Sequence, residues 1–142
     1  MPISLVGSEM CIRDRYRLLD IHAPLENFRP LLTEDVQLVF PEATVKGFEG
    51  YSGWYTNVIN IFFDEVHTLK IADITNQDDG GCEAHVVVNW HASIWNAPEA
   101  RSIRLMMDAD QTWQVHRQAD GSLGVSKYVV NFMTYEPGSC KL

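Results

Sequence analysis

Two histidines in the middle of the chain are the residues whose spacing first suggests chemistry. His67 and His91 lie in two runs rich in β-branched and apolar residues, 66–77 and 82–95. The sequence DDGG at 78–81 supplies residues that tolerate the positive φ of a tight turn, so a β-hairpin is predicted. An imidazole titrates near neutral pH and can therefore donate or accept a proton during catalysis.

The register of this hairpin decides whether the two imidazoles meet. If the loop consists of the three residues 78–80, His67 lies directly opposite His91. Facing side chains on one sheet surface have Cβ atoms about 4.5–5.5 Å apart. A two-residue turn at 79–80 shifts the pairing by one residue and places the histidines on opposite faces. The sequence leaves both registers open.

Composition limits the class of protein. A chain of 142 residues with 46% hydrophobic content indicates one ordered domain with its own core. The net charge of −8 and the absence of a Lys/Arg cluster argue against a nucleic-acid partner. No run approaches the roughly 20 apolar residues of a membrane span, so no membrane partner is expected. Three scattered cysteines and an N-terminus without a signal-peptide pattern favour a cytoplasmic location.

The first fifteen residues differ from the remainder of the chain. MPISLVGSEMCIRDR has no clean helical or strand period, and the string SLVGSEMCIRDR resembles a translated sequencing adapter of the kind that enters metagenomic reading frames. We therefore expect residues 1–15 to be a non-native leader that replaces the natural start of the first helix, and we leave them out of the functional interpretation. An ordinary flexible leader would lead to the same exclusion.

The rest of the chain predicts helices followed by a run of strands. The expected elements are a helix ending at 16–20, a short or kinked helix from Pro24 that contains Pro30, a strand at 36–40, a helix at 48–62, the hairpin, strands at 102–117 and 125–135, and a tail at 137–142. This order predicts an α+β domain over 16–136, in which helices are segregated from a curved antiparallel sheet.

The order of elements and three short motifs resemble the nuclear transport factor 2-like superfamily. The motifs are LLD at 18–20, LLTEDVQLVF at 31–40 and KGFEGYSGWY at 46–55. The superfamily includes SnoaL-like polyketide cyclases, ketosteroid isomerases, limonene epoxide hydrolases and scytalone dehydratases. The resemblance implies a cone: a curved, mixed but mostly antiparallel sheet wrapped around about three N-terminal helices, with an apolar pocket open at one end. It also implies a homo-oligomer that pairs through the outer face of the sheet.

The scytalone dehydratase pattern within this superfamily implies a catalytic set. That family uses an Asp after the first helix, a His that begins the strand after the third helix, and a His on the next strand. Asp20, His67 and His91 occupy the matching places. The family's two water-holding tyrosines correspond to about Leu19 and Phe40, which cannot donate a hydrogen bond, so the full dehydratase site is not carried over.

The two faces of the strand at 84–94 leave an alternative open. Its even positions are uniformly apolar, whereas its odd positions, which include His85, Asn89 and His91, are mixed. A mixed face can line a polar-tipped pocket, or it can be the outer, subunit-facing side of the sheet. In the second case Asp20 is a helix-capping residue and the histidines are unrelated strand residues.

An aromatic-rich pocket for a planar or polycyclic ligand is predicted. The candidate substrate-binding residues are Phe40, Trp54, Tyr55, Asn89, Trp95, Tyr128 and Asn131. The histidines show no HxH or HExxH spacing, so neither a metal nor an organic cofactor is expected.

Three functions are compatible with these features. The first is a cofactor-independent lyase or isomerase, of the dehydratase or cyclase type, that acts on a small apolar cyclic ligand through Asp20, His67 and His91. The second is a non-catalytic ligand-binding or oligomerisation domain that uses the same cone. The third is hydrolysis of an epoxide or a lactone. The faces on which the two histidines lie discriminate between the first two.

Overall fold

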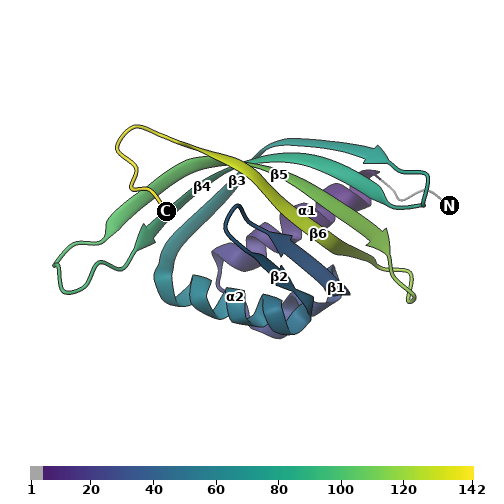
Figure 1. Ribbon diagram of the computed structural model, residues 1–142, viewed down its shortest axis with the longest axis horizontal. Coiled ribbons are helices and arrows are strands. Elements are labelled where there is room, and N and C mark those ends of the chain that lie inside the picture. The colour runs from purple at the N-terminus through teal and green to yellow at the C-terminus, as the bar shows by residue number, and fades with distance from the viewer. Residues whose placement is uncertain (1–4) are drawn as a thin grey trace.

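The computed structural model describes residues 5–142 and is shown in Figure 1. Its helical elements are α1 (Leu5–Asp20), the 3-10 turns η1 (Leu25–Asn27) and η2 (Arg29–Leu31), and α2 (Gly47–Ile61). Its strands are β1 (Leu32–Val39), β2 (Thr44–Lys46), β3 (Phe62–Asn76), β4 (Cys82–Ile94), β5 (Ile103–Arg117) and β6 (Leu123–Tyr135).

One curved sheet contains all six strands, in the order β2-β1-β6-β5-β4-β3. Neighbouring strands are antiparallel except for β1 and β6, which are parallel. The long strands arch over α1, α2 and the short strands β1 and β2, so the helices lie on the concave side of the sheet (Figure 1). The predicted α+β cone with a mixed, mostly antiparallel sheet is confirmed.

The first helix contains most of the predicted leader. Residues 5–15 are helical and continue without a break to Asp20. Ser8, Ile12 and Arg15 are buried in this segment, at the spacing of one helix face. The expectation that 5–15 lacks a helical pattern is therefore wrong, because a small polar and a charged side chain occupy positions where an apolar stripe would have been visible. Residues 1–4 lie outside the described residues, and the adapter origin of the string stays a prediction.

Proline governs the connection between α1 and β1. The short helix predicted from Pro24 consists of two 3-10 turns, and Pro30 occupies the second. A proline inside an α-helix removes an N–H and clashes with the preceding turn, which prevents the turns from merging. Phe28 lies between them, fully buried, with its ring 4.7 Å from that of Tyr55 and 5.6 Å from that of Tyr51 on α2.

The β3–β4 hairpin changes register along its length. Next to the turn Asn76 pairs with Cys82, as predicted for a loop of three residues. An extra residue, Lys70, then shifts the pairing, so His67 lies opposite Trp90 and not opposite His91. Of the two arrangements that the sequence left open, the one in which the histidines face each other is not the one found. Because successive strand residues point to opposite faces, this bulge separates the histidines onto the two sides of the sheet.

A second bulge lies at the start of β3. Asp64 and Glu65 stand opposite one residue, Ala92, and Asp64 has a left-handed φ of 50°. In a regular strand, positions three apart point to opposite faces. The bulge lets both Phe62 and Glu65 face the inside of the cone, and both are buried.

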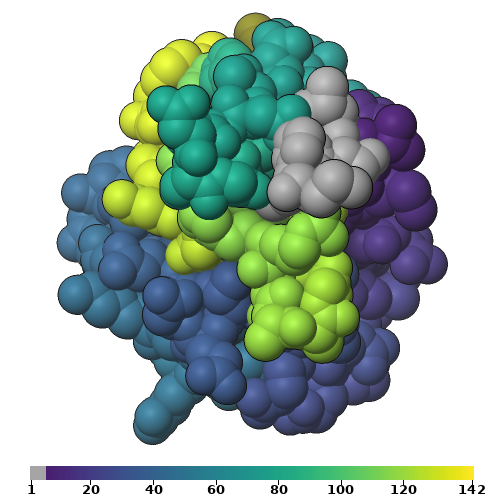
Figure 2. All heavy atoms as spheres, turned by 90° about the vertical axis from the view of Figure 1, so that its right-hand side faces the viewer, coloured from purple at the N-terminus to yellow at the C-terminus, as the bar shows by residue number. Residues whose placement is uncertain are grey.

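The two ends of the molecule differ. The β3–β4 and β5–β6 turns lie side by side near the start of α1 at one end, which faces the viewer in Figure 2. The other end carries the loop between β4 and β5 and the C-terminal tail (Figure 1). The tail is held against β5, because the backbone N–H of Cys140 donates to the carbonyl of Arg104 and Ser139 Oγ accepts the N–H of Met106.

Arg15 is the one fully buried basic side chain among the described residues, with 1% of its surface exposed. Its guanidinium lies among aromatic rings, 4.4 Å from the centroid of Tyr128 and 5.1 Å from that of Trp113. In the described part of the chain no carboxylate forms an ion pair with it. Cation–π contacts offset part of the desolvation cost of such a charge, but an unpaired buried ion remains expensive.

Replacing Arg15 by an apolar side chain of similar length should therefore stabilise the fold. R15M is expected to raise the free energy of unfolding by about 1–4 kcal/mol, the range seen when buried ions are replaced by well-packed apolar groups. Chemical denaturation of both proteins measures this, with R13M as the control because Arg13 is exposed and paired only with Glu9. A less stable R15M would show that the aromatic contacts outweigh the desolvation cost.

Candidate active site

A cavity of about 610 Å³ lies between the concave face of the sheet and the helices. Its wall is mostly apolar and aromatic, with contributions from α1, α2 and all four long strands. Leu142, at the end of the C-terminal tail, and the 41–43 loop between β1 and β2 also line the cavity. The volume is in the range of small-molecule sites.

Asp20 and His67 form a hydrogen-bonded pair at this wall. Asp20 is the last residue of α1, and His67 faces inward from β3 and lines the cavity. Asp20 Oδ1 lies 2.5 Å from His67 Nδ1, and Asp20 Oδ2 accepts the backbone N–H of His67 at 3.1 Å. A carboxylate at Nδ1 keeps the proton on that nitrogen and leaves Nε2 as the basic one. Within residues 5–142 no protein group hydrogen bonds to Nε2.

Two aromatic rings stack on this imidazole and fix its orientation. The ring of Tyr16, one turn before Asp20 on α1, lies 4.8 Å from that of His67 at an interplanar angle of 21°. The ring of Trp90, opposite His67 in the hairpin, lies 5.4 Å away at 10°. The imidazole of His67 is therefore held by its hydrogen bond to Asp20 and by both rings, while the backbone N–H of His67 fixes the Asp20 carboxylate.

A second carboxylate–imidazole pair lies beside the first. Glu65 precedes His67 by two residues on the same face of β3 and also lines the cavity. His22 Nε2 lies 2.5 Å from Glu65 Oε2, and only 1% of the Glu65 side chain is exposed. Burial raises the pKa of Glu65, and the nearby imidazoles of His22 and His67 offset part of that rise. Sequence reasoning missed this pair.

The missed pair had a weak signal in the sequence. The end of α1 reads Asp20-x-His22, and β3 reads Glu65-x-His67, so each segment offers an acid and an imidazole two residues apart. In the structure each acid bonds to the imidazole of the other segment: Asp20 pairs with His67, and Glu65 pairs with His22. The sequence alone could not show that the two segments meet.

A third polar spot lies across the cavity on β5 and β6. Gln111 is buried and lines the cavity; its Oε1 accepts hydrogen bonds from the hydroxyl of Tyr16 and, at 3.0 Å, from Trp113 Nε1. Its Nε2 donates to the hydroxyl of Tyr128 at 2.7 Å. Burial raises the pKa of both phenols, so they are neutral hydrogen-bond donors at ordinary pH. The Tyr128 hydroxyl proton is the one that this network leaves for a ligand.

Three of the predicted substrate-binding residues line the cavity: Phe40, Trp54 and Tyr128. Tyr55 does not line it, because its hydroxyl donates to the carbonyl of Ala23 at 2.6 Å and its ring packs against that of Phe28. Trp95 lies just beyond the end of β4, is 64% exposed and stacks on Phe63.

The remaining predicted residues lie on the convex face of the sheet. His91 Nε2 is 2.7 Å from Glu136 Oε2, so the structure does not bring His91 to Asp20 and His67. Asn89 donates to Asp108, and Asn131 donates to Asp110. The interpretation of this odd-numbered face as a pocket wall is wrong, since the cavity is lined by the even-numbered Val88 and Trp90.

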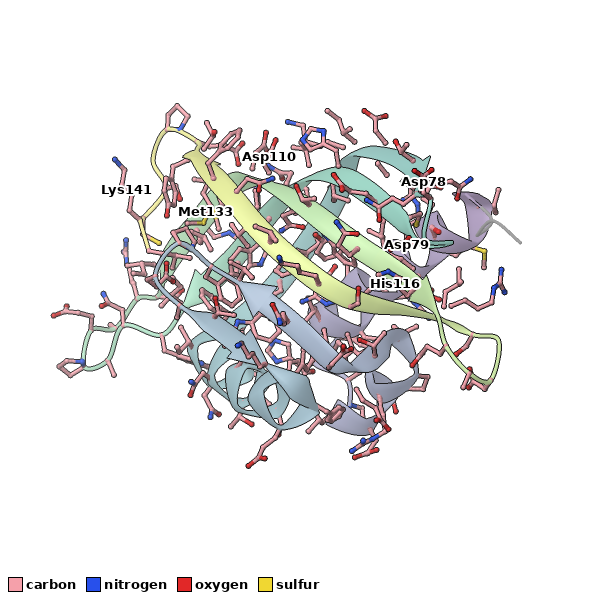
Figure 3. The ribbon with its side chains drawn as sticks, turned by 45° about the vertical axis from the view of Figure 1, so that its right-hand side comes forward. Asp78, Asp79, Asp110, His116, Met133 and Lys141 are labelled. Atoms are coloured by element: carbon pink, nitrogen blue, oxygen red, sulfur yellow. The ribbon has the colours of Figure 1, made fainter. Side chains whose placement is uncertain are left out.

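The same division of faces continues on β5 and β6. Asp110 extends from the convex side in Figure 3, where His85 Nε2 lies 2.8 Å from its Oδ2. Met133 pairs with Ala109 in the ladder, and both line the cavity from the other face.

Among residues 5–142 no group of three or more His, Cys, Asp or Glu side chains is placed to hold a metal ion. No described helix is both long and apolar enough to cross a membrane.

Comparison of the sequence with protein-family models and with curated proteins finds no match. The fold, in contrast, is similar to many solved structures. A hexachlorocyclohexane dehydrochlorinase, LinA-type3 from Novosphingobium barchaimii, has a TM-score of 0.77 and 16% identity, over 96% of this chain and 92% of that one. A candidate aromatic ring hydroxylase from Novosphingobium aromaticivorans has a TM-score of 0.79 and 13% identity, over 93% and 92%. A candidate scytalone dehydratase from the same species has a TM-score of 0.65 and 18% identity, over 93% and 87%.

These similarities establish the fold. The chain has the cone-shaped α+β fold that the resemblance implied. Within that cone it carries a carboxylate–imidazole pair on the wall of an apolar cavity.

The geometry of this pair predicts the tautomer of His67. In the wild-type protein the neutral ring should carry its proton on Nδ1, facing Asp20. In D20N the amide N–H₂ can donate to Nδ1, which favours the tautomer protonated on Nε2. Nitrogen-15 NMR of the imidazole distinguishes the two forms, and His116, whose Nδ1 lies 2.8 Å from Ser126 Oγ, serves as an internal control. An unchanged His67 tautomer in D20N would contradict this prediction.

Proposed function

We propose that this chain is a cofactor-independent lyase or isomerase that removes a proton from carbon in a small cyclic substrate. The observation that carries the proposal is the Asp20–His67 pair. His67 lies on the wall of an apolar cavity, and its Nε2 accepts no hydrogen bond from the described residues. His67 is the general base, and Asp20 is the residue that positions it.

The chemistry follows from the environment of the ring. His67 Nε2 takes a proton from substrate carbon, and the imidazolium that forms lies 2.5 Å from the Asp20 carboxylate. Charge interactions of this kind are stronger where water is excluded than in bulk solvent. A positioned general base contributes about 10²–10⁴-fold to rate.

The cavity supports the choice of substrate class. Its volume of about 610 Å³ suits a molecule of one or two rings, and its aromatic walls suit planar apolar groups. The Tyr128 hydroxyl, held by Gln111, is placed to donate to a substrate carbonyl or hydroxyl oxygen. An enolisable cyclic ketone combines these features, because a donor on its oxygen acidifies the neighbouring C–H.

The names of similar structures agree with this chemistry. A dehydrochlorinase and a dehydratase, the names of two of them, both denote elimination from a substrate. Elimination and isomerisation share the first step, which is removal of a proton from carbon by a base. The Asp20–His67 pair provides such a base here.

Association between copies is a further part of the proposal. The convex face carries exposed apolar side chains, among them Val66, Ile71 and Phe132, between charged and polar groups. Exposed apolar area of this kind is typical of protein interfaces. We propose that this face pairs with that of a second copy, which is the role that the convex residues, including His91, would then serve.

The three cysteines, Cys11, Cys82 and Cys140, are all free. Free thiols persist where glutathione and thioredoxin keep the compartment reducing. We propose a cytoplasmic location on this ground.

Replacing His67 should remove activity, whereas replacing His91 should not. Three probes give the same product, 2-cyclohexenone, whose ultraviolet absorbance reports turnover: 3-hydroxycyclohexanone, 3-chlorocyclohexanone and 3-cyclohexenone. H67A is expected to lower the enzyme-dependent rate on the accepted probes by about 10²-fold or more. H91A, which alters the convex face only, is the matched control and is expected to stay within about twofold.

Two outcomes would contradict the proposal. One is a wild-type rate in H67A, which would show that the imidazole is not the base. The other is the absence of turnover of all three probes together with binding of 2-cyclohexenone, which would favour a non-catalytic ligand-binding domain.

A further inference from the structure

The Glu65–His22 pair has features that a structural ion pair does not need. Glu65 lines the cavity two residues from His67 on the same face of β3, so the two titratable groups border the same space. Burying a carboxyl group to 1% exposure is costly, and an exposed position would avoid that cost. Its partner His22 is different, because 28% of that side chain reaches solvent. The pair therefore connects the inside of the cavity with the outside of the protein.

Backbone strain lies on both sides of this pair. Among the described residues, His22 and Asp64 are the two non-glycine residues with positive φ, each at 50°. Asp64 is the bulge residue that turns Glu65 inward. Residues in unfavourable backbone regions concentrate at functional sites, where the surrounding structure holds them in place.

His22 occupies a position where helices usually place glycine. The N–H of Ala23 bonds to the carbonyl of Leu18, and the N–H of His22 to that of Leu19, which is the pattern of a helix end closed by a left-handed residue. Glycine adopts this conformation without strain. The imidazole at this position thus replaces the residue that helix geometry prefers, and its contact is Glu65.

We propose that Glu65 is the proton donor of the cavity and that His22 supplies it with protons from solvent. This inference rests on the proposed function and specifies the leaving group. His67 removes the proton from carbon, and Glu65 protonates the group that departs. The substrate class it implies is a cyclic β-hydroxy ketone, because hydroxide is a poor leaving group without a proton and chloride needs none.

The C–H bond breaks, its proton goes to His67 Nε2, and its electron pair forms the C=C bond. The C–O bond breaks with its electron pair on oxygen, and the proton from Glu65 converts that oxygen to water. His67 then releases its proton to solvent, and Glu65 regains one through His22. The net reaction is loss of water from the substrate.

The surroundings of Glu65 raise its pKa above that of an ordinary carboxyl group. Burial raises the pKa of Glu65 and is the largest influence, followed by the opposing effects of His22 from the end of α1 and His67 on β3. The Asp20 carboxylate raises the Glu65 pKa as well. From α2, Tyr55 faces Glu65, and its own pKa is raised to about 12, so it is neutral beside the acid.

The test compares leaving groups in E65Q, a variant of the same size that keeps a polar group beside His22. Removal of the general acid is expected to lower the rate on 3-hydroxycyclohexanone by about 10²-fold and to change the rate on 3-chlorocyclohexanone by less than about threefold. Equal losses on both probes, or no loss on either, would overturn the assignment. If H67A also leaves both rates intact, the proposed function fails; if H67A abolishes both and E65Q spares both, only the role of Glu65 fails.

Infrared spectroscopy gives a readout that needs no turnover. A protonated carboxyl group has a C=O stretch distinct from that of a carboxylate, and the wild-type protein at neutral pH should show one such band that is missing in E65Q. A spectrum without that band overturns the proposal whatever the rates. Thermal melts of both proteins establish that the variant is folded.

His22 is tested by chemical rescue. H22G keeps the helix end, since glycine suits the left-handed position, but removes the imidazole and leaves a partly exposed gap beside Glu65. Turnover of 3-hydroxycyclohexanone should fall in H22G and recover when free imidazole is added, while turnover of 3-chlorocyclohexanone should respond to neither. A loss that imidazole does not restore would mean that His22 has a structural role only.

Discussion

Two extra residues in β3, Asp64 and Lys70, determine which side chains reach the cavity. In a regular strand, side chains alternate between the two faces of the sheet from end to end. Each bulge adds one residue, so the residues beyond it point to the opposite face from the one they would otherwise occupy. The bulge at Lys70 places His67 opposite Trp90 and leaves His91 on the convex side. The bulge at Asp64 then turns Glu65 inward together with Phe62. Both titratable residues of β3 on the cavity wall depend on these two irregularities.

The end of α1 is the second half of this arrangement. Helix α1 ends beside β3, so Asp20 and His22 approach the strand from one side and pair with His67 and Glu65. Each acid thereby acquires an imidazole as its hydrogen-bond partner, which is the condition under which an apolar cavity can hold polar, ionisable groups. Arg15, further back on the same helix, lies among aromatic side chains and forms no ion pair with a carboxylate in the described part of the chain.

Much of the fold could be predicted from the sequence because its signals are local. Hydrophobic spacing predicted α2 and the four long strands, Pro30 predicted the broken helix, and short motifs indicated the cone. The uniformly apolar even positions of β4 marked the inner face correctly. The 5–15 part of α1 was missed because Ser8 and Arg15 interrupt its apolar stripe at buried positions.

The site was only partly predictable, because its geometry depends on non-local pairing. Asp20 and His67 were found through the resemblance, and they do meet. His91 was misplaced because a one-residue bulge leaves no mark in composition yet reverses the face of every residue beyond it. Asn89 and Asn131 lie on the outer face, where they bond to Asp108 and Asp110. Gln111 and Glu65 were missed because only the folded sheet brings them to the cavity, where they contact residues of α1 and of the segment after it.

The central claim is that His67 removes a proton from carbon inside the cavity, and it can be measured without a leaving group. Cyclohexanone has enolisable hydrogens but cannot undergo elimination, so its exchange with deuterium oxide reports the first step alone. The account predicts that the wild-type protein accelerates exchange at the carbon next to the carbonyl, that H91A does the same, and that H67A gives the rate of buffer. Equal acceleration by H67A and the wild-type protein would show that another group is the base and would contradict the account.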